Sequence, residues 1–285
     1  MLKPFSVSPF FASLSLFGIF SVFVSLRSIL NKVNFFSIIK KTSCKGKWVI
    51  VTDISNHIGK AALDYLAEIG YNIIIFNYLA ENEIARYKEK FNISIKQILI
   101  NNQKNKIKSL LNSESSNLKI DFLVITNIKL VTLRLDQYPE SDLKSLIKKL
   151  LKEPKSILKW FMETNKSKKL PSKILCFISS TKNGLWPFST VVSSVSSYWE
   201  ELLRNINQDP LFKCSCCIFG NIPYDTRDNE VDLEVQASKF VSKAIELTGQ
   251  KFKFYGHWKQ YLEKQIFSMK IMKEYRCIYS AKNIK

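Results

Sequence analysis

The stretch that decides the fold reads Trp48-Val49-Ile50-Val51-Thr52-Asp53-Ile54-Ser55-Asn56-His57-Ile58-Gly59-Lys60. Its apolar run from Trp48 to Thr52 predicts a buried strand. Apolar residues recur at helical spacing from Gly59 to Ile69, and Gly70 is well placed to cap the end of that helix. The apolar run from Asn72 to Phe76 then predicts a second strand. A strand, a turn, a helix and a strand in about 30 residues predict one βαβ unit.

The same alternation of short apolar runs and longer amphipathic stretches continues along the chain. Two long helices are expected, one from Asp142 to Met162, which Pro154 should kink or divide, and one from Val191 to Ile206. Alternating strands and helices favour a parallel sheet covered by helices on both faces, which is a doubly wound, three-layer α/β fold. The further expected strands are Gln97 to Ile100, Asp121 to Thr126, Ile174 to Ser179 and Cys214 to Phe219.

Composition limits the classes of function. The 285 residues, 46% of them apolar, suit one folded domain with one core. The net charge of +19 is spread along the chain, and six of the 43 basic residues are arginines, which argues against nucleic-acid binding and favours a compositional bias of the source. Six cysteines are too few for a disulfide scaffold, and His57 and His257 offer no metal-ligand spacing, so no metal site is expected.

The amino-terminal segment is strongly apolar. Between Lys3 and Arg27 lie 23 residues without a charge, which is long enough to span a bilayer with some tilt. Because only Lys3 precedes this run and no tidy cleavage site follows it, a retained transmembrane helix is favoured over a cleaved signal peptide. The basic residues that follow place the folded domain on the cytosolic side. We therefore expect a membrane anchor and basic linker over residues 1–44 and a folded domain over residues 45–285.

The turn from Thr52 to Lys60, led by Gly46-Lys47-Trp48, resembles the TGxxxGIGK turn of the short-chain dehydrogenase/reductase superfamily, whose fold is of Rossmann type. Tyr255-Gly256-His257-Trp258 and the stretch from Met272 to Ala281 are similar to the tail of membrane-bound very-long-chain 3-ketoacyl-CoA reductases and related hydroxysteroid dehydrogenases. The resemblance covers about Lys45 to Lys282. It implies hydride transfer from NADPH to a ketone and a location in the endoplasmic reticulum membrane.

The catalytic residues that this resemblance implies are largely replaced. The family places a Tyr-x-x-x-Lys motif on the helix after a strand ending in Ile-Ser-Ser. That strand end is present and supplies Ser180, which either orients a substrate carbonyl or is an ordinary strand-end serine. The tyrosine and lysine positions, however, fall on Val192 and Ser196. Valine has no proton to give and serine has no cation to lower a phenol pKa. The family's asparagine position falls near Leu150.

The cofactor turn is degraded in parallel. The cofactor-binding positions of this turn are occupied by Thr52, Asp53, His57, Ile58 and Gly59. Asp53 and His57 replace two of the family's three glycines and add bulk where the backbone should approach a pyrophosphate. The resemblance implies NADP(H) as the cofactor, and these substitutions predict that its binding is weak or lost.

The sequence therefore favours a membrane-anchored, catalytically inactive relative of the ketone reductases, acting in lipid metabolism as a homodimer or with a lipid-enzyme partner. The alternative is an active NADPH-dependent reductase of a 3-ketoacyl-CoA or steroid ketone with a remodelled site, in which Lys182 is a conceivable surrogate base. A third hypothesis is a basic surface that binds membranes or nucleic acid, if one helix presents the lysine stripe Lys144, Lys148, Lys152, Lys155 and Lys159.

Overall fold

A computed structural model of the chain describes residues 44–99, 118–127, 139–179, 190–219 and 230–255. The chain divides into two compact units, residues 1–41 and residues 42–285, and every described residue belongs to the second. The predicted anchor between Lys3 and Arg27 lies outside the described residues. Among those that are described, no helix combines the length and the apolar character needed to cross a bilayer.

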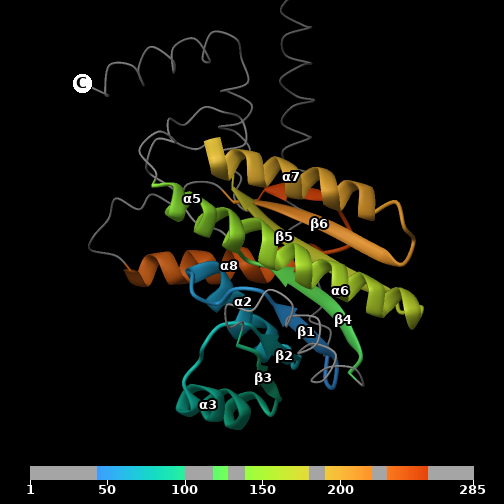
Figure 1. The fold of residues 1–285 in the computed structure, drawn as a ribbon. Coiled ribbons are helices and arrows are strands. Elements are labelled where there is room, and N and C mark those ends of the chain that lie inside the picture. Colours follow the sequence, from blue (N-terminus) through green and yellow to red (C-terminus); the bar gives the residue numbers. More distant parts are fainter. Residues whose placement is uncertain (1–43, 100–117, 128–138, 180–189, 220–229, 256–285) are drawn as a thin grey trace, which may run out of the picture. The chain divides into compact units, whose positions relative to one another are not determined.

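Within the described ranges, seven strands form one entirely parallel sheet in the order β3-β2-β1-β4-β5-β6-β7 (Figure 1). The sequence predicted six of them, although β3 lies earlier than the predicted range of Gln97 to Ile100 and shares only Gln97 with it. The short edge strand β7 was not predicted. The strands are β1 (Trp48–Val51), β2 (Asn72–Ile75), β3 (Ile95–Gln97), β4 (Ile120–Ile125), β5 (Ser172–Ser179), β6 (Phe212–Phe219) and β7 (Lys253–Tyr255).

Helices cover both faces of the sheet, because successive side chains on a strand point to opposite faces. On β5, Cys176 belongs to a buried cluster that includes Trp199 and Leu203 of α7, whereas Phe177 points the other way and its ring lies 5.8 Å from that of Phe240 on α8. The three-layer prediction is thus confirmed, while α3 and α8 were not predicted. The helical elements are α2 (His57–Glu68), α3 (Glu81–Phe91), α5 (Glu140–Ile147), the π-helical η2 (Lys148–Lys152), α6 (Glu153–Ser167), α7 (Thr190–Ile206) and α8 (Glu230–Leu247).

The long helix predicted around Pro154 is divided by a π-helical turn just before the proline, with Pro154 itself in the first turn of α6. Proline has no N–H, so it leaves the carbonyl four or five residues earlier without its helical donor. These two carbonyls, of Leu150 and Lys149, accept hydrogen bonds from side chains of other parts of the chain. The indole Nε1 of Trp199 donates to the Leu150 carbonyl at 3.1 Å, and Nδ2 of Asn127 donates to the Lys149 carbonyl at 3.1 Å.

This pairing predicts a coupling between two residues on different helices. Trp199→Phe should lower the free energy of unfolding by about 2 kcal/mol, because it leaves the buried Leu150 carbonyl without a donor. In a Pro154→Ala background residue 154 regains an N–H, so the same substitution should cost about 1 kcal/mol less. Denaturant unfolding of the four proteins measures this coupling. Additive costs would contradict the assignment, since loss of indole volume alone does not depend on residue 154.

Candidate functional site

The strand order reverses between β1 and β4, at the centre of the sheet. In open parallel sheets, ligands bind in the crevice beyond the carboxyl ends of the two strands at such a reversal. The turn that begins at Thr52 follows β1, and Thr126 and Asn127 follow β4. The topology therefore brings the predicted cofactor turn to the place where this class of fold binds its ligands.

Several backbone N–H groups of the turn are hydrogen bonded to side chains of the same chain. Anion-binding turns hold phosphates with such N–H groups, which must be free to point at the ligand. In this turn, four backbone N–H groups donate hydrogen bonds to nearby side-chain oxygens. The four bonds are Asp53 N to Thr126 Oγ1 (3.0 Å), Ile54 N to Asn77 Oδ1 (2.9 Å), Ser55 N to Asp53 Oδ1 (2.9 Å) and Gly59 N to Asn56 Oδ1 (2.8 Å).

Side chains also join the two strand ends across the reversal. The Thr52 hydroxyl donates to the side-chain oxygen of Asn127 and accepts the Thr126 amide at 3.0 Å. The Thr126 hydroxyl donates to the Asp53 carbonyl, and the Asn56 side chain donates to the Thr126 carbonyl at 2.8 Å. The crevice between the carboxyl ends of β1 and β4 is thus spanned by direct hydrogen bonds.

The remaining turn residues take separate places. His57 is the exposed first residue of α2, while Ile58 is buried with 4% of its surface exposed. Asn56 has extended backbone angles and caps the helix. A Cβ at Gly59 would lie 1.8 Å from the Asp53 carbonyl oxygen, so the retained glycine is required by the close approach of the turn to α2. This requirement needs no ligand.

The two positions that the family uses for its catalytic pair lie in the packed core. Val192 is 5% exposed and Ser196 is 4% exposed, and both are on α7. The Ser196 hydroxyl accepts the backbone amide of Ser179 at 3.2 Å, which joins α7 to the carboxyl end of β5. These residues make packing contacts and a structural hydrogen bond, and neither carries a group that titrates near neutral pH.

Leu150, at the predicted asparagine position, is likewise buried at 4% exposure, and its carbonyl is bonded to Trp199. Tyr198, the aromatic neighbour of Trp199, packs edge-on against the indole ring at 5.9 Å. The Lys155 ammonium lies 5.5 Å from the centroid of the Tyr198 ring, over its face. Lowering the pKa of a phenol requires a cation near its hydroxyl oxygen. Lys155 instead lies over the ring of Tyr198, so this contact does not make Tyr198 a substitute for the family's tyrosine.

Several predicted positions lie outside the described residues: Ser180, Lys182 and the carboxyl-terminal motif from Gly256 onward. Conversely, the sequence reasoning missed the residues that fill the turn. Asn56, immediately before a helical pattern, carries a recognisable N-cap signal. Asn77, Thr126 and Asn127 follow the strands, and nothing local in the sequence assigns their partners.

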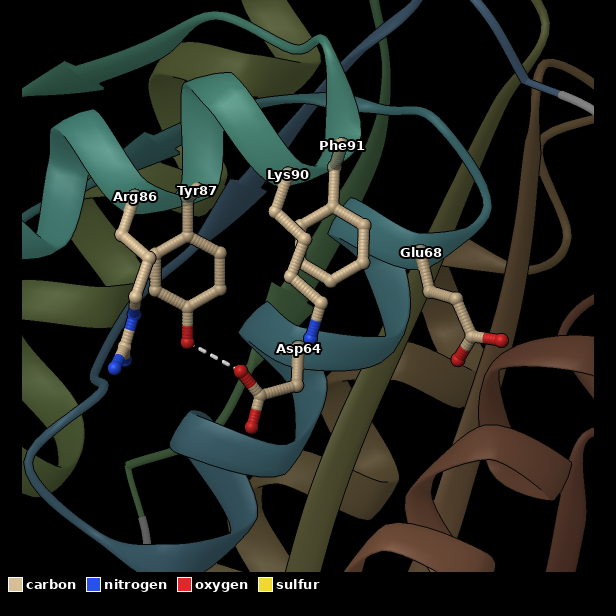
Figure 2. Close-up of a pocket in the computed structure, with 6 residues that line it drawn as sticks. All are labelled: Asp64, Glu68, Arg86, Tyr87, Lys90 and Phe91. Atoms are coloured by element: carbon tan, nitrogen blue, oxygen red, sulfur yellow. Dashed lines mark hydrogen bonds between the residues drawn. The ribbon is translucent and has the colours of Figure 1, made fainter.

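A cavity of about 650 Å³ lies away from this edge, between α2 and α3. Figure 2 shows that Asp64 of α2 faces Tyr87 of α3, and the Tyr87 hydroxyl donates to the Asp64 carboxylate. The Lys90 ammonium lies 4.8 Å from the centre of the Phe91 ring. Two acids and two bases line the cavity, so its charges balance and favour no class of ligand. Its lining residues are Asp64, Glu68, Arg86, Tyr87, Lys90 and Phe91.

The predicted lysine stripe is partly neutralised along the helices that carry it. Lys144 pairs with Glu140 at 2.6 Å and Lys148 pairs with Glu153 at 3.6 Å. Such pairs reduce the field that a row of lysines presents to an anionic surface. They leave less reason to assign the stripe to membrane or nucleic-acid binding.

No protein-family model matches the chain, and no characterised protein matches it in sequence. Solved structures do match it in fold. A 7β-hydroxysteroid dehydrogenase superposes with a TM-score of 0.68 at 11% identity, over 82% of this chain and 96% of that one. A gluconate 5-dehydrogenase from Burkholderia cenocepacia, solved with NADP and tartrate, gives 0.60 at 13% identity, over 74% and 93%.

An alcohol dehydrogenase from the archaeon Thermococcus sibiricus, solved with 5-hydroxy-NADP, gives a TM-score of 0.62 at 15% identity, over 73% of this chain and 95% of that one. Likeness at these identities is a likeness of fold. The chain therefore has the three-layer, Rossmann-type α/β fold of these dehydrogenases.

Proposed function

We propose that the chain is a non-catalytic member of the short-chain dehydrogenase/reductase superfamily, which has kept the fold as a scaffold and lost hydride transfer. The fold of the hydroxysteroid and alcohol dehydrogenases supports the superfamily. The proposed relation to membrane-bound very-long-chain 3-ketoacyl-CoA reductases rests on the motifs at both ends of the sequence.

One observation carries the loss of catalysis. The positions of the expected acid, base and asparagine, which are Val192, Ser196 and Leu150, are all at most 5% exposed. Ketone reduction needs a proton donor in contact with the forming alkoxide. At these three positions the chain supplies apolar packing and a hydroxyl bonded to the backbone of Ser179.

The dinucleotide does not fit the turn as the chain builds it. A pyrophosphate would have to displace side chains from the amides of Asp53, Ile54, Ser55 and Gly59. It would also approach the Asp53 carboxylate, which accepts the Ser55 amide and, at 2.7 Å, the Ser55 hydroxyl. An anion beside an anion is repelled. We propose that NADP(H) binding is lost for both reasons.

We also propose that the amino-terminal apolar segment anchors the chain in the endoplasmic reticulum membrane, with the folded domain in the cytosol. The uncharged run and the basic residues after it support this arrangement. In that position the domain can bind a protein of lipid metabolism. We propose that binding such a partner is the role of this non-catalytic scaffold.

The proposal is tested with the full-length chain in nanodiscs. NADPH at 1 mM should leave the thermal unfolding midpoint unchanged, whereas a ligand present at 100 times its Kd stabilises a protein by about 2.7 kcal/mol. No oxidation of NADPH should follow the addition of a 3-ketoacyl-CoA. Micromolar NADPH binding together with turnover of the ketoacyl-CoA would establish the active-reductase alternative instead.

A further inference from the structure

Lysines gather at the amino-terminal edge of the sheet. Because all the strands are parallel, the segments that lead into them meet at this one edge. These segments are residues 44–48, 69–73, 92–96, 118–121, 168–173, 207–213 and 248–253. All but residues 69–73 contain lysine, whereas their carboxylates are Asp121 and Asp209 alone. Exposed lysines of this edge include Lys45, Lys47, Lys119, Lys169, Lys173 and Lys213.

The two carboxylates neutralise little of this charge. Asp121 pairs with Lys47 at 3.4 Å, and Asp209 pairs with Lys166 of α6 at 2.8 Å. Both are therefore already occupied by a lysine of their own. The fold thus concentrates at one edge a positive charge that looks evenly spread along the sequence.

Two of the lysines are held side by side. Lys173 on β5 and Lys213 on β6 are register partners, and both are exposed. Neighbouring strands lie about 4.8 Å apart, and like charges directly opposite one another destabilise a sheet. Within the part of the chain that the structure describes, no carboxylate pairs with either lysine. An anion outside the domain would relieve this repulsion.

Helix ends account for only part of the lysine. Each helix returns the chain to this edge, so the carboxyl-terminal ends of α6 and α7 lie here, and their partial negative charge favours cations in the last turn. Lys173 and Lys213, however, lie on strands, several residues after α6 ends at Ser167 and α7 ends at Ile206. The interaction with the helix ends therefore does not explain this pair.

The polypeptide enters the folded domain at the same edge. The Cys44 N–H donates to the Ile69 carbonyl, at the end of α2, at 3.0 Å, and the Cys44 carbonyl accepts the Lys47 N–H at 3.1 Å. The segment that we propose as the membrane anchor precedes Cys44 in the chain. The basic edge is therefore the one at which the linker from the anchor joins the domain.

The chemistry of the edge suits lipid headgroups. Its strand-leading segments contain no arginine, and lysine presents a compact point charge in place of the fork that favours nucleic acids. The exposed large apolar side chains of the described residues, Tyr78 and Leu99, follow strands at the opposite edge. Contact at the lysine edge is therefore electrostatic, without insertion into the acyl region.

We infer that the amino-terminal edge of the sheet lies against the cytosolic leaflet and binds its anionic phospholipid headgroups through these lysines. The cytosolic leaflet carries a negative surface potential that attracts basic segments close to it. The inference rests on the proposed anchor, and it adds the class of lipid and the orientation of the domain. The carboxyl-terminal edge, where the turn from Thr52 lies, then faces the cytosol.

The test uses the full-length chain in two nanodiscs, one of phosphatidylcholine and one containing phosphatidylglycerol, an anionic lipid without an amine. Brief acetylation with acetic anhydride, followed by mass spectrometry, measures the reactivity of each lysine. Lys119, Lys169 and Lys213 should react about threefold more slowly in the anionic nanodisc, and about 0.5 M salt should remove the difference. Lys60 and Lys152, which lie toward the opposite edge, should react equally in both.

Charge reversal separates the edge from the net charge. Lys173→Glu combined with Lys213→Glu should reduce the difference at Lys119 and Lys169 to less than about 1.5-fold, because β5 and β6 adjoin the segments that carry them. The matched control, Lys60→Glu combined with Lys239→Glu, changes the net charge equally and should leave the threefold difference intact. Circular dichroism shows that each variant is folded before its lysines are compared.

The outcomes distinguish the edge from the anchor. Equal acetylation in the two nanodiscs, by a chain that both retain, would overturn the inference and leave the anchor standing. A chain that the nanodiscs do not retain would overturn the proposed anchor and the inference with it. Equal slowing at Lys60 and Lys152 would contradict the orientation. Single-stranded RNA that protects the edge lysines more strongly than phosphatidylglycerol does would assign the edge to nucleic acid. None of these measurements involves NADPH, so the loss of hydride transfer is tested separately.

Discussion

Gly59→Ala is expected to lower the free energy of unfolding by about 3 to 5 kcal/mol, or to prevent folding altogether. The added Cβ would lie 1.8 Å from the Asp53 carbonyl oxygen and 2.8 Å from the Ile54 Cα. Both are backbone atoms, so relief requires α2 to move away from the turn. Such a shift would stretch the hydrogen bond that the Gly59 N–H donates to the Asn56 side chain. Denaturant unfolding, followed by circular dichroism, measures the loss.

Gly46→Ala is the matched control for this substitution. Gly46 has a φ of +80°, but nothing lies within 4 Å of the Cβ that an alanine would add. Its cost should be limited to the left-handed backbone conformation, about 1 to 2 kcal/mol. Equal costs for the two substitutions would show that the turn does not approach α2 closely, which would contradict the packing described around Gly59.

Lys253→Met is expected to cost about 3 kcal/mol of unfolding free energy, because it removes one partner of a buried ion pair. The Glu200 carboxylate on α7 is 3% exposed, and both of its oxygens lie 2.9 Å from the Lys253 ammonium on β7. Arg204 also contacts Glu200 at 3.0 Å, but its own side chain is 56% exposed. The pair ties the edge strand β7 to the helix layer.

The double variant Glu200→Met with Lys253→Met separates charge from volume. Replacing both members of a buried pair by apolar residues of similar size is often nearly neutral. We expect this variant to unfold within about 1 kcal/mol of the unaltered chain, and so to be more stable than Lys253→Met alone. A double variant less stable than the single one would mean that side-chain packing, and not the loss of the Lys253 charge beside Glu200, accounts for the cost.

Much of the fold could be predicted because it rests on local patterns. Five of the seven strands carry apolar runs that predict a strand covered on both faces, as the fully buried Val49, Ile50 and Val51 show for β1. β7 escaped prediction because three residues at an edge make no periodic signal. The helix break was predicted at Pro154, but the compensation by Trp199 and Asn127 depends on contacts between segments far apart in the sequence, which no local pattern contains.

The candidate site was predicted only as a set of substitutions. The sequence located the turn and indicated that Asp53 and His57 add bulk there. It did not indicate that Asn77 and Thr126 bond the amides, because these two partners follow other strands, β2 and β4. In our proposal, the main obstacle to a phosphate is therefore a network of side chains that tertiary structure assembles.

We propose that side chains of the protein, in place of a dinucleotide, accept hydrogen bonds from the backbone amides of the turn. Amide hydrogen exchange of the full-length chain tests this most directly. The amides of Asp53, Ile54, Ser55 and Gly59 should be protected without any ligand, because each is already hydrogen bonded. Saturating NADPH should leave that protection unchanged. Amides that exchange freely in the absence of NADPH and become protected when it is added would contradict the account.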